Sequence, residues 1–322
     1  MKVQMPSPRN HLRASLKLLD SIASEAGGHP HYPVVRGLLD RPQDLPDQVS
    51  PKDSAMKYDV YRAQSPAGAR WGVTLNDRFE HRTLNSAFLE ALDRLPGDYA
   101  LNDILAQRGS LSEHSMVVGI GFDRVDQPPR VKIYLQEESW GAGVTGNTQA
   151  ARIIDALAPG CRLPGWVEGR SVGVLSLTLS ALGERSARVY LGGLSPLEAA
   201  EGAPPEALAL ARAMELASPM PGGWYYLTLR LASDGAHRYA INKIYNTVEI
   251  GFRGAPLAAG EAWEDVRRLF DRANHGPTLD ALRRMLGELP DLIVLPTATA
   301  LEGDADSTDL YMAAWERAHS PD

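Results

Sequence analysis

The sequence has little cysteine, no long apolar run and no block of like charge. Cys161 is the only cysteine among 322 residues, which excludes an intramolecular disulfide and favours a reducing, cytoplasmic location. No run of about 18 apolar residues indicates a membrane-spanning helix. Residues 1–10 lack the apolar core of a signal peptide. The net charge of −7 comes without the basic stripe that a nucleic-acid surface needs, so we expect neither nucleic acid nor membrane as a partner.

Motifs of several enzyme classes are also missing. Asp-Asp-x-x-Asp, the magnesium-binding motif of α-helical isoprenoid synthases, does not occur. The glycine-rich stretch at 141–146 lacks the lysine of a phosphate loop and the parallel strand–helix–strand unit of a dinucleotide site. No Ser–His or Cys–His signature near a turn indicates acyl transfer. These absences leave the strands as the place to look for chemistry.

A unit of two strands and one or two helices recurs along the chain. An amphipathic helix is predicted first at 11–25, and the proline-rich stretch 30–51 is expected to be irregular. Five hairpins are then predicted, at 58–64 with 70–75, 115–124 with 130–137, 172–181 with 187–192, 224–232 with 238–250, and 292–299 with 309–315. Helices are predicted between them, at 83–95, 147–157, 205–217, 261–273 and 278–289. Short antiparallel connections of this kind argue against a parallel barrel.

The predicted strands have one aliphatic and one polar-aromatic face. In 224–232, for example, Leu227 and Leu229 alternate with Tyr226, Thr228 and Arg230. Helices can cover the aliphatic faces, and a sheet that closes on itself would enclose the polar faces as a lumen. We therefore predict an α+β fold: a closed antiparallel ten-stranded barrel with a polar lumen inside a ring of helices. It forms a single domain over 1–322, with a lead-in at 1–56 and barrel repeats at 57–316.

The triplet Lys-Ile-Tyr occurs twice, at 132–134 and 243–245, and Arg188-Val-Tyr190 and Asp309-Leu-Tyr311 are related to it. The four tyrosines are separated by 56, 55 and 66 residues, which indicates a repeat architecture. In 130–134, Arg130, Lys132 and Tyr134 project from one face within about 14 Å, at roughly 3.4 Å per residue. Two cations and a phenol on one strip suit a diphosphate. The plain alternative is a solvated strand face, which the repetition of the pairing makes less attractive.

Arg130-Val-Lys132-Ile-Tyr134 resembles the Arg-x-Lys-x-Tyr strand motif of aromatic prenyltransferases of the dimethylallyltryptophan synthase type. The stretch 187–195 is similar to a strand of soluble bacterial enzymes that prenylate phenols, and Tyr226 and Arg238 have a spacing similar to their phosphate-binding tyrosine and arginine. The resemblance implies the ABBA fold, or PT barrel, with five ααββ-type repeats.

The resemblance also implies a reaction and its residues. An allylic diphosphate, dimethylallyl or geranyl, ionises; cations hold the pyrophosphate, tyrosines shield the carbocation, and an indole, phenol or peptide side chain attacks it. The cation-shielding residues expected from the resemblance are Tyr134, Tyr190, Tyr226 and Tyr245. The diphosphate-binding residues expected from it are Arg130, Lys132, Arg188, Arg238 and Lys243.

Four residues fit this pattern less directly. Lys243 and Tyr245 have the opposite strand parity from Arg238, so both sets face the lumen only if a bulge intervenes. Asp309 stands where the phenol-prenylating enzymes have a lysine, and it either faces outward or holds an amine or guanidine of the acceptor. Asp59 resembles a magnesium-ligating aspartate, but one carboxylate leaves magnesium open, and no absolute requirement for it is expected.

Two further readings remain open beside the prenyltransferase. A non-catalytic barrel of the same fold could bind a small amphipathic molecule in its lumen. Several buried cations would count against a binder of neutral lipids, because an unpaired buried charge is unfavourable. A transferase of acyl or phosphate groups with a coincidental strand pattern would need a nucleophile–base pair.

Overall fold

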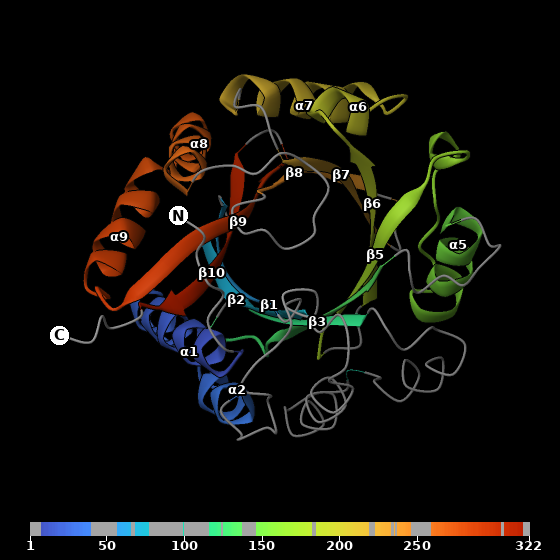
Figure 1. Cartoon of the computed structure of the whole chain (residues 1–322). Coiled ribbons are helices and arrows are strands. Elements are labelled where there is room, and N and C mark those ends of the chain that lie inside the picture. Colours follow the sequence, from blue (N-terminus) through green and yellow to red (C-terminus); the bar gives the residue numbers. More distant parts are fainter. Residues whose placement is uncertain are drawn as a thin grey trace.

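Ten antiparallel strands form a closed barrel in the computed structural model (Figure 1). The structure describes residues 8–39, 57–65, 68–76, 99, 116–123, 125–136, 146–181, 185–218, 223–232, 235, 237–245, 259–303 and 306–317. Neighbours in sequence are neighbours in the sheet, and the first strand pairs with the last, from Val60 opposite Met312 to Gln64 opposite Thr308. The predicted closure of the sheet is therefore confirmed, and it removes the exposed edges of an open sheet.

The strands follow one another as five hairpins, close to the predicted positions. Their bounds are β1 Lys57–Ser65, β2 Gly68–Asn76, β3 Met116–Phe122, β4 Arg130–Gln136, β5 Val172–Leu179, β6 Arg185–Gly193, β7 Trp224–Leu231, β8 His237–Ile244, β9 Leu292–Glu302 and β10 Ser307–Glu316.

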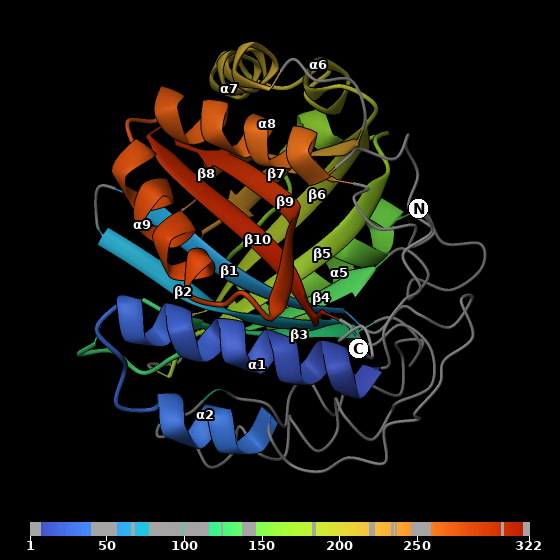
Figure 2. The same cartoon turned by 60° about the vertical axis from the view of Figure 1, so that its left-hand side comes forward.

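Helices surround the barrel on the outside, as Figures 1 and 2 show from two directions. Their bounds are α1 Pro8–Glu25, α2 Tyr32–Leu39, α5 Gly146–Leu157, α6 Pro196–Ala199, α7 Pro205–Ala217, α8 Ala259–Arg272 and α9 Gly276–Gly287, with a 3₁₀ turn at Gly165–Val167. The predicted helix 83–95 lies outside the described residues. No helix in the described ranges is long and apolar enough to cross a membrane.

The proline-rich stretch 30–51 is not irregular throughout, because α2 forms within it. Pro33 is the second residue of this helix. Proline fits the first helical turn, where its missing N–H has no intrahelical partner to lose. The expectation of an irregular lead-in is thus wrong for 32–39.

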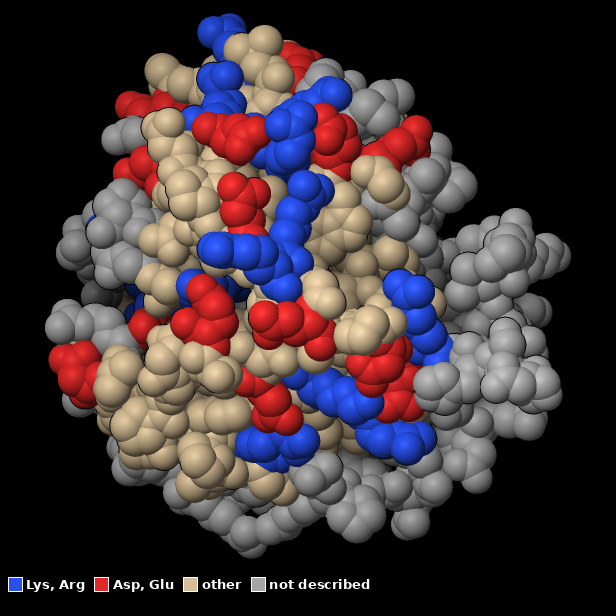
Figure 3. Space-filling view, turned by 90° about the vertical axis from the view of Figure 1, so that its left-hand side faces the viewer, with Lys and Arg blue, Asp and Glu red and all other residues tan. Residues whose placement is uncertain are grey.

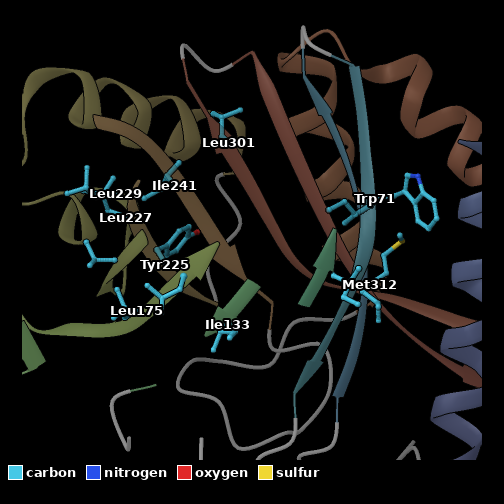
Figure 4. Packing of buried hydrophobic residues seen from close by; sticks show 14 of the residues in the cluster. Trp71, Ile133, Leu175, Tyr225, Leu227, Leu229, Ile241, Leu301 and Met312 are labelled. Carbon is cyan, nitrogen blue, oxygen red and sulfur yellow. The ribbon is translucent and has the colours of Figure 1, made fainter. Parts of the chain in front are cut away.

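The core lies between the barrel and its helices. Leu227 and Leu229 of β7 are completely buried there, together with Ile133 of β4 and Leu175 of β5 (Figure 4). These residues come from the aliphatic faces that the alternation predicts. Burial of this face turns the polar face of each strand inward, and so places the polar side chains around the barrel axis.

Two irregularities interrupt the strand register. Between β5 and β6, Val172 pairs with Leu191 but Val174 pairs with Tyr190, so Gly173 is the extra residue of a bulge. A Cβ atom on Gly173 would lie 3.5 Å from Cε1 of Tyr226. The second shift lies between β9 and β10, where Met312 pairs with Pro296. Proline has no N–H for the sheet, and bulges are one of the few places in a sheet that tolerate it.

Charges of both signs alternate over the outer face formed by α8 and α9 (Figure 3). On α8, Arg267 pairs with Glu264 at 2.6 Å and with Asp271 at 3.1 Å, and Arg268 pairs with Glu264 at 3.3 Å. This face carries no patch of one sign, which agrees with the lack of a charge block in the sequence.

Candidate active site

A pocket lies inside the barrel, toward the end where the hairpin turns join the strands. It is lined by residues of β2, β3, β4, β5, β6, β7 and β10 and by Asp123, which follows β3. The lining residues are Arg70, Gly121, Asp123, Arg130, Lys132, Thr178, Arg188, Arg230 and Asp309. Five of the nine residues are cationic, so the centre of an acidic protein is basic.

The strip on β4 lies as the sequence predicts. Arg130 and Lys132 line the pocket, while Val131 and Ile133 are completely buried on the opposite face. Arg130 forms an ion pair with Asp123, the residue that follows β3. The strand thus presents both cations to the lumen and its aliphatic residues to the core.

Lys132 is held among other cations. Burial, the nearby Arg188 and the charges of Arg70 and Arg130 lower its pKa to about 7, although Asp309 acts in the opposite direction. The protonated ammonium is therefore poorly stabilised in the free protein. An anion that entered the pocket would relieve this strain and draw a proton onto Lys132.

Arg188 and Arg230 lie directly opposite each other on β6 and β7. Like charges in this position repel each other. Burial and the charges of Arg188 and Arg130 lower the pKa of Arg230 to about 10. Among the described residues, Arg230 has no hydrogen bond or ion pair. Its guanidinium can therefore donate hydrogen bonds to an anionic ligand.

Carboxylates interrupt the ring of cations on one side. Nη2 of Arg70 donates to Oδ1 of Asp309 at 3.2 Å and lies 3.7 Å from Glu302, the last residue of β9. Arg188 also lies 3.7 Å from Glu302. Burial alone would raise the pKa of Glu302, but Arg188, Arg70 and Arg230 hold it below its ordinary value. Glu302 is therefore ionised and lies 3.7 Å from two of the cations that line the pocket.

Aromatic rings form a connected wall next to the cations. The ring centroids of Tyr134 and Tyr190 are 6.3 Å apart, and those of Tyr190 and Tyr226 are 6.0 Å apart with the planes at 85°. Trp224 continues the row, 6.2 Å from Tyr226. Burial raises the pKa of Tyr190, so its phenol stays neutral. The structure thus brings three of the four predicted tyrosines together.

Lys243 and Tyr245 do not join this group, which corrects the expectation that they line the lumen. β8 pairs with β7 without a register shift, so no bulge changes the parity of Lys243. Its ammonium lies 2.8 Å from Oδ2 of Asp265 on α8, and Tyr245 donates to the same oxygen at 2.9 Å. Both side chains therefore lie on the outer side of the barrel, beneath a helix.

The remaining predicted residues take different positions. Arg238 pairs with Arg230 across β7 and β8, but its side chain is exposed and does not line the pocket. Asp309 lines the lumen, so the alternative that it faces outward is wrong, and its carboxylate accepts a hydrogen bond from Arg70. Asp59 pairs with Thr74 in the sheet, and its side chain lies outside the described residues.

Sequence reasoning assigned no role in the site to Arg70, Arg230, Glu302 or Trp224, although it placed Arg230 on the polar face of its strand. Arg230 and Trp224 share their face of β7 with Tyr226, so strand alternation could have identified both. Arg70 and Glu302 have no comparable signal, because each stands near a hairpin turn outside any repeated triplet. In the described residues, no three His, Cys, Asp or Glu side chains are grouped to hold a metal ion.

Comparison with known proteins points to one fold. No protein-family model and no curated protein sequence matches the chain. The 6-dimethylallyltryptophan synthase from Micromonospora olivasterospora, solved with DMASPP and Trp, is 17% identical with a TM-score of 0.64, over 96% of this chain and 98% of that one.

Two further solved structures are similar over the same extent. The prenyltransferase PriB in complex with L-tryptophan and dimethylallyl thiolodiphosphate is 16% identical with a TM-score of 0.62, over 97% of this chain and 99% of that one. AnaPT from Neosartorya fischeri is 10% identical with a TM-score of 0.66, over 97% and 95%. The chain therefore shares its fold, from end to end, with the PT-barrel prenyltransferases that the strip 130–134 resembles.

Proposed function

We propose that this protein is an aromatic prenyltransferase, which moves a dimethylallyl or geranyl group from its diphosphate to an electron-rich acceptor. The observation that carries the proposal is the juxtaposition of five cationic side chains and an aromatic wall in one lumen. An indole, a phenol or a peptide side chain would serve as the acceptor.

The cations bind and stabilise the leaving group. Arg230 forms no ion pair or hydrogen bond among the described residues, although Glu302 lies near enough to raise its pKa, and Lys132 has a pKa lowered to about 7 by burial and by Arg188. A diphosphate supplies the negative charge that both groups need. Its charge grows as the C–O bond breaks, so cations fixed in a partly dehydrated lumen stabilise the transition state more than the ground state.

The rings act on the other product of ionisation. Faces of Tyr134, Tyr190 and Tyr226 carry negative electrostatic potential and attract a carbocation. A neutral phenol is a weak nucleophile, and burial raises the pKa of Tyr190 and keeps it neutral. The wall therefore stabilises the allylic cation without capturing it.

The step balances without a redox partner. The allylic C–O bond breaks and its electron pair leaves with the pyrophosphate. A pair of electrons from the acceptor forms the new bond to the allylic carbon, and the acceptor's proton passes to the departing pyrophosphate. Exclusion of water from the lumen prevents loss of the cation to hydrolysis.

Structures with the same fold support the choice of substrates. PriB has been solved with product diphosphate and with L-tryptophan and dimethylallyl thiolodiphosphate. The Micromonospora olivasterospora enzyme has been solved with DMASPP and Trp. At identities of 16% and 17% these ligands are a guide to the class of substrate for this chain.

Calorimetric titration with dimethylallyl thiodiphosphate tests the proposal. We expect micromolar binding by the native chain, with or without Mg²⁺, and at least tenfold weaker binding by Lys132→Ala. Arg268→Ala is the matched control, because it removes a cation from the exposed face of α8. No binding of any allylic diphosphate, with or without Mg²⁺, would contradict the enzyme and favour a barrel that binds another small molecule.

A further inference from the structure

We propose that Glu302 and Asp309 form a subsite for a cationic nitrogen group of the acceptor, an ammonium or a guanidinium, which becomes available when a diphosphate engages the arginines. This inference rests on the proposed function and deepens it. The inference assigns a ligand to the two carboxylates, and it implies that the diphosphate binds before the acceptor.

The carboxylate of Glu302 is only loosely held. Its two oxygens lie 3.7 Å from Nη2 of Arg70 and 3.7 Å from Nη2 of Arg188. Both separations exceed the length of a hydrogen bond. No described residue donates a hydrogen bond to Glu302, and 14% of its side chain remains exposed. Its oxygens can therefore accept hydrogen bonds from a ligand.

Asp309 is placed beside Glu302 by the pairing of β9 and β10. Its Oδ1 accepts one hydrogen bond from Arg70 at 3.2 Å. That same Nη2 atom of Arg70 is the one nearest to Glu302, so a single guanidinium nitrogen serves two carboxylates. If Arg70 turned to another anion, both carboxylates would lose a common partner.

The arginines are poised to change partners. Nε of Arg188 is buried and has no hydrogen-bond partner among the described residues. Contacts of 3.7 Å lack the short, forked geometry that makes an arginine–carboxylate pair strong. A diphosphate offers several oxygens to each guanidinium, at bond lengths of about 2.8 Å. The arginines should therefore favour the diphosphate over Glu302.

The balance of charge then reverses. Five lumen cations against three carboxylates, Asp123, Glu302 and Asp309, leave two positive charges in excess. A diphosphate ester adds about three negative charges, since a terminal phosphate alone carries nearly two. The loaded lumen then has surplus negative charge at its carboxylates, and an uncompensated buried carboxylate is unfavourable. A cation beside Glu302 and Asp309 restores the balance.

An acceptor anchored in this way lies next to the aromatic wall. Tyr190 is two residues from Arg188 on the same face of β6, and Arg188 borders Glu302. The cationic group thus recognises the carboxylates while the electron-rich part of the acceptor extends toward Tyr190. Because binding free energies are reciprocal, the cationic ligand must also strengthen diphosphate binding.

Four small probes test the subsite by calorimetry. Agmatine supplies a guanidinium, tryptamine an ammonium on an indole, 3-methylindole no charge and indole-3-acetate an anion. Each is titrated into the native protein with and without saturating dimethylallyl thiodiphosphate. We expect agmatine, tryptamine or both to bind at least about fivefold tighter with the diphosphate present. The affinity for 3-methylindole should change less, and that for indole-3-acetate should fall.

Two variants locate the effect. Glu302→Gln and Asp309→Asn keep the shape of each side chain and remove its charge. Both should bind the diphosphate at least as tightly as the native chain and lose the enhancement for the cationic probes. Equal enhancement for 3-methylindole in the native protein would overturn the subsite, whether or not the variants fold, and so would full enhancement in both variants. The diphosphate titration is read separately, so its failure would instead count against the prenyltransferase itself.

Discussion

The two Lys-Ile-Tyr triplets are identical in sequence but occupy opposite sides of the barrel wall. Lys132 lies in the lumen among Arg70, Arg130 and Arg188, where burial and Arg188 lower its pKa to about 7. Lys243 lies outside the barrel with its ammonium 2.8 Å from Asp265. Burial lowers the pKa of Lys243 too, but Asp265 opposes the shift. One lysine has a dedicated carboxylate, and the other lies among arginines whose effect on its pKa is only partly opposed by Asp309.

This difference separates a structural lysine from a ligand-binding one. Oδ2 of Asp265 also accepts hydrogen bonds from Ser218 at 2.5 Å and from Tyr245 at 2.9 Å, so the protein itself neutralises the charge of Lys243, although Oδ1 of Asp265 has no partner among the described residues. In the lumen cluster the groups without a partner among the described residues are cationic, namely Arg230 and Nε of Arg188. A motif therefore gains its role from the face of the strand on which it falls.

The largest expected effect comes from breaking the outer pair. Asp265→Ala leaves the ammonium of Lys243 buried without its counter-charge, and we expect a loss of about 3–5 kcal/mol in the free energy of unfolding. Urea denaturation measures it. The lumen variant Lys132→Met should leave the unfolding free energy unchanged or slightly raised, because it removes a poorly stabilised charge. Equal destabilisation by both variants would remove the distinction between the two lysines.

The next effect concerns the ligand. Lys132→Ala removes a charge-assisted hydrogen bond to the diphosphate, which corresponds to about 1.5–3 kcal/mol of binding free energy, or roughly tenfold to a hundredfold in affinity. Calorimetry with dimethylallyl thiodiphosphate measures the change, and Lys132→Arg should restore part of the affinity. An unchanged affinity in Lys132→Ala would show that the diphosphate lies elsewhere.

The pH dependence follows from the lowered pKa of Lys132. With a pKa of about 7 in the free protein, Lys132 must gain a proton when an anion binds above that pH. Diphosphate affinity should be constant below about pH 7 and fall as pH rises, by up to about tenfold per unit, which is the limit for one proton. Titrations at pH 8 in buffers of different ionisation enthalpy should detect uptake of nearly one proton. Lys132→Ala should abolish that uptake, and its persistence would assign the proton to another group.

The same pKa shift has a consequence for stability. The folded pKa of Lys132 lies below its ordinary value of 10.5, so the unfolded chain binds the extra proton between these two values. The contribution of Lys132 to stability should therefore rise as pH increases from about 7 toward 10.5. The side chain of Lys132 is only partly buried, so solvent screening makes the effect smaller than the full shift suggests.

The smallest expected effect concerns the aromatic wall. Tyr190→Phe keeps the ring face and should change kcat by less than about threefold, whereas Tyr190→Leu removes a cation–π contact of about 1 kcal/mol and should lower kcat about fivefold. Single-turnover kinetics with a prenyl-accepting substrate measure both. A larger loss in Tyr190→Phe than in Tyr190→Leu would assign the role to the hydroxyl instead of the ring.

Much of this architecture can be predicted from the sequence because strand alternation is a local property. Leu227 and Leu229 alternate with Tyr226 and Thr228, and the structure buries the first pair in the core and turns the second inward. The strip 130–134 follows from the same rule. Strand parity also indicates that the side chains of Lys243 and Arg238 lie on opposite faces of β8. Because no bulge occurs between β7 and β8, Lys243 lies on the outer side of the barrel.

What could not be predicted depends on contacts between distant residues. Asp265 is 22 residues from Lys243 on a separate helix, and no local pattern links them. Glu302 reaches the arginines only because β9 pairs with β8 and β10 in the closed sheet. The proline content of 30–51 predicts irregular structure, but Pro33 lies in the first turn of α2, where proline is compatible with a helix. Composition alone does not give the position of each proline relative to a helix.

The most direct test of the central claim compares the two lysines in one assay. Dimethylallyl thiodiphosphate is titrated into Lys132→Ala and into the double variant Lys243→Met/Asp265→Leu, which replaces the outer pair by apolar side chains and avoids an unpaired buried charge. We predict that the double variant binds within about threefold of the native affinity and that Lys132→Ala binds at least about tenfold more weakly. Native affinity in Lys132→Ala, or loss of binding in a folded double variant, would contradict the assignment of the lumen as the diphosphate site.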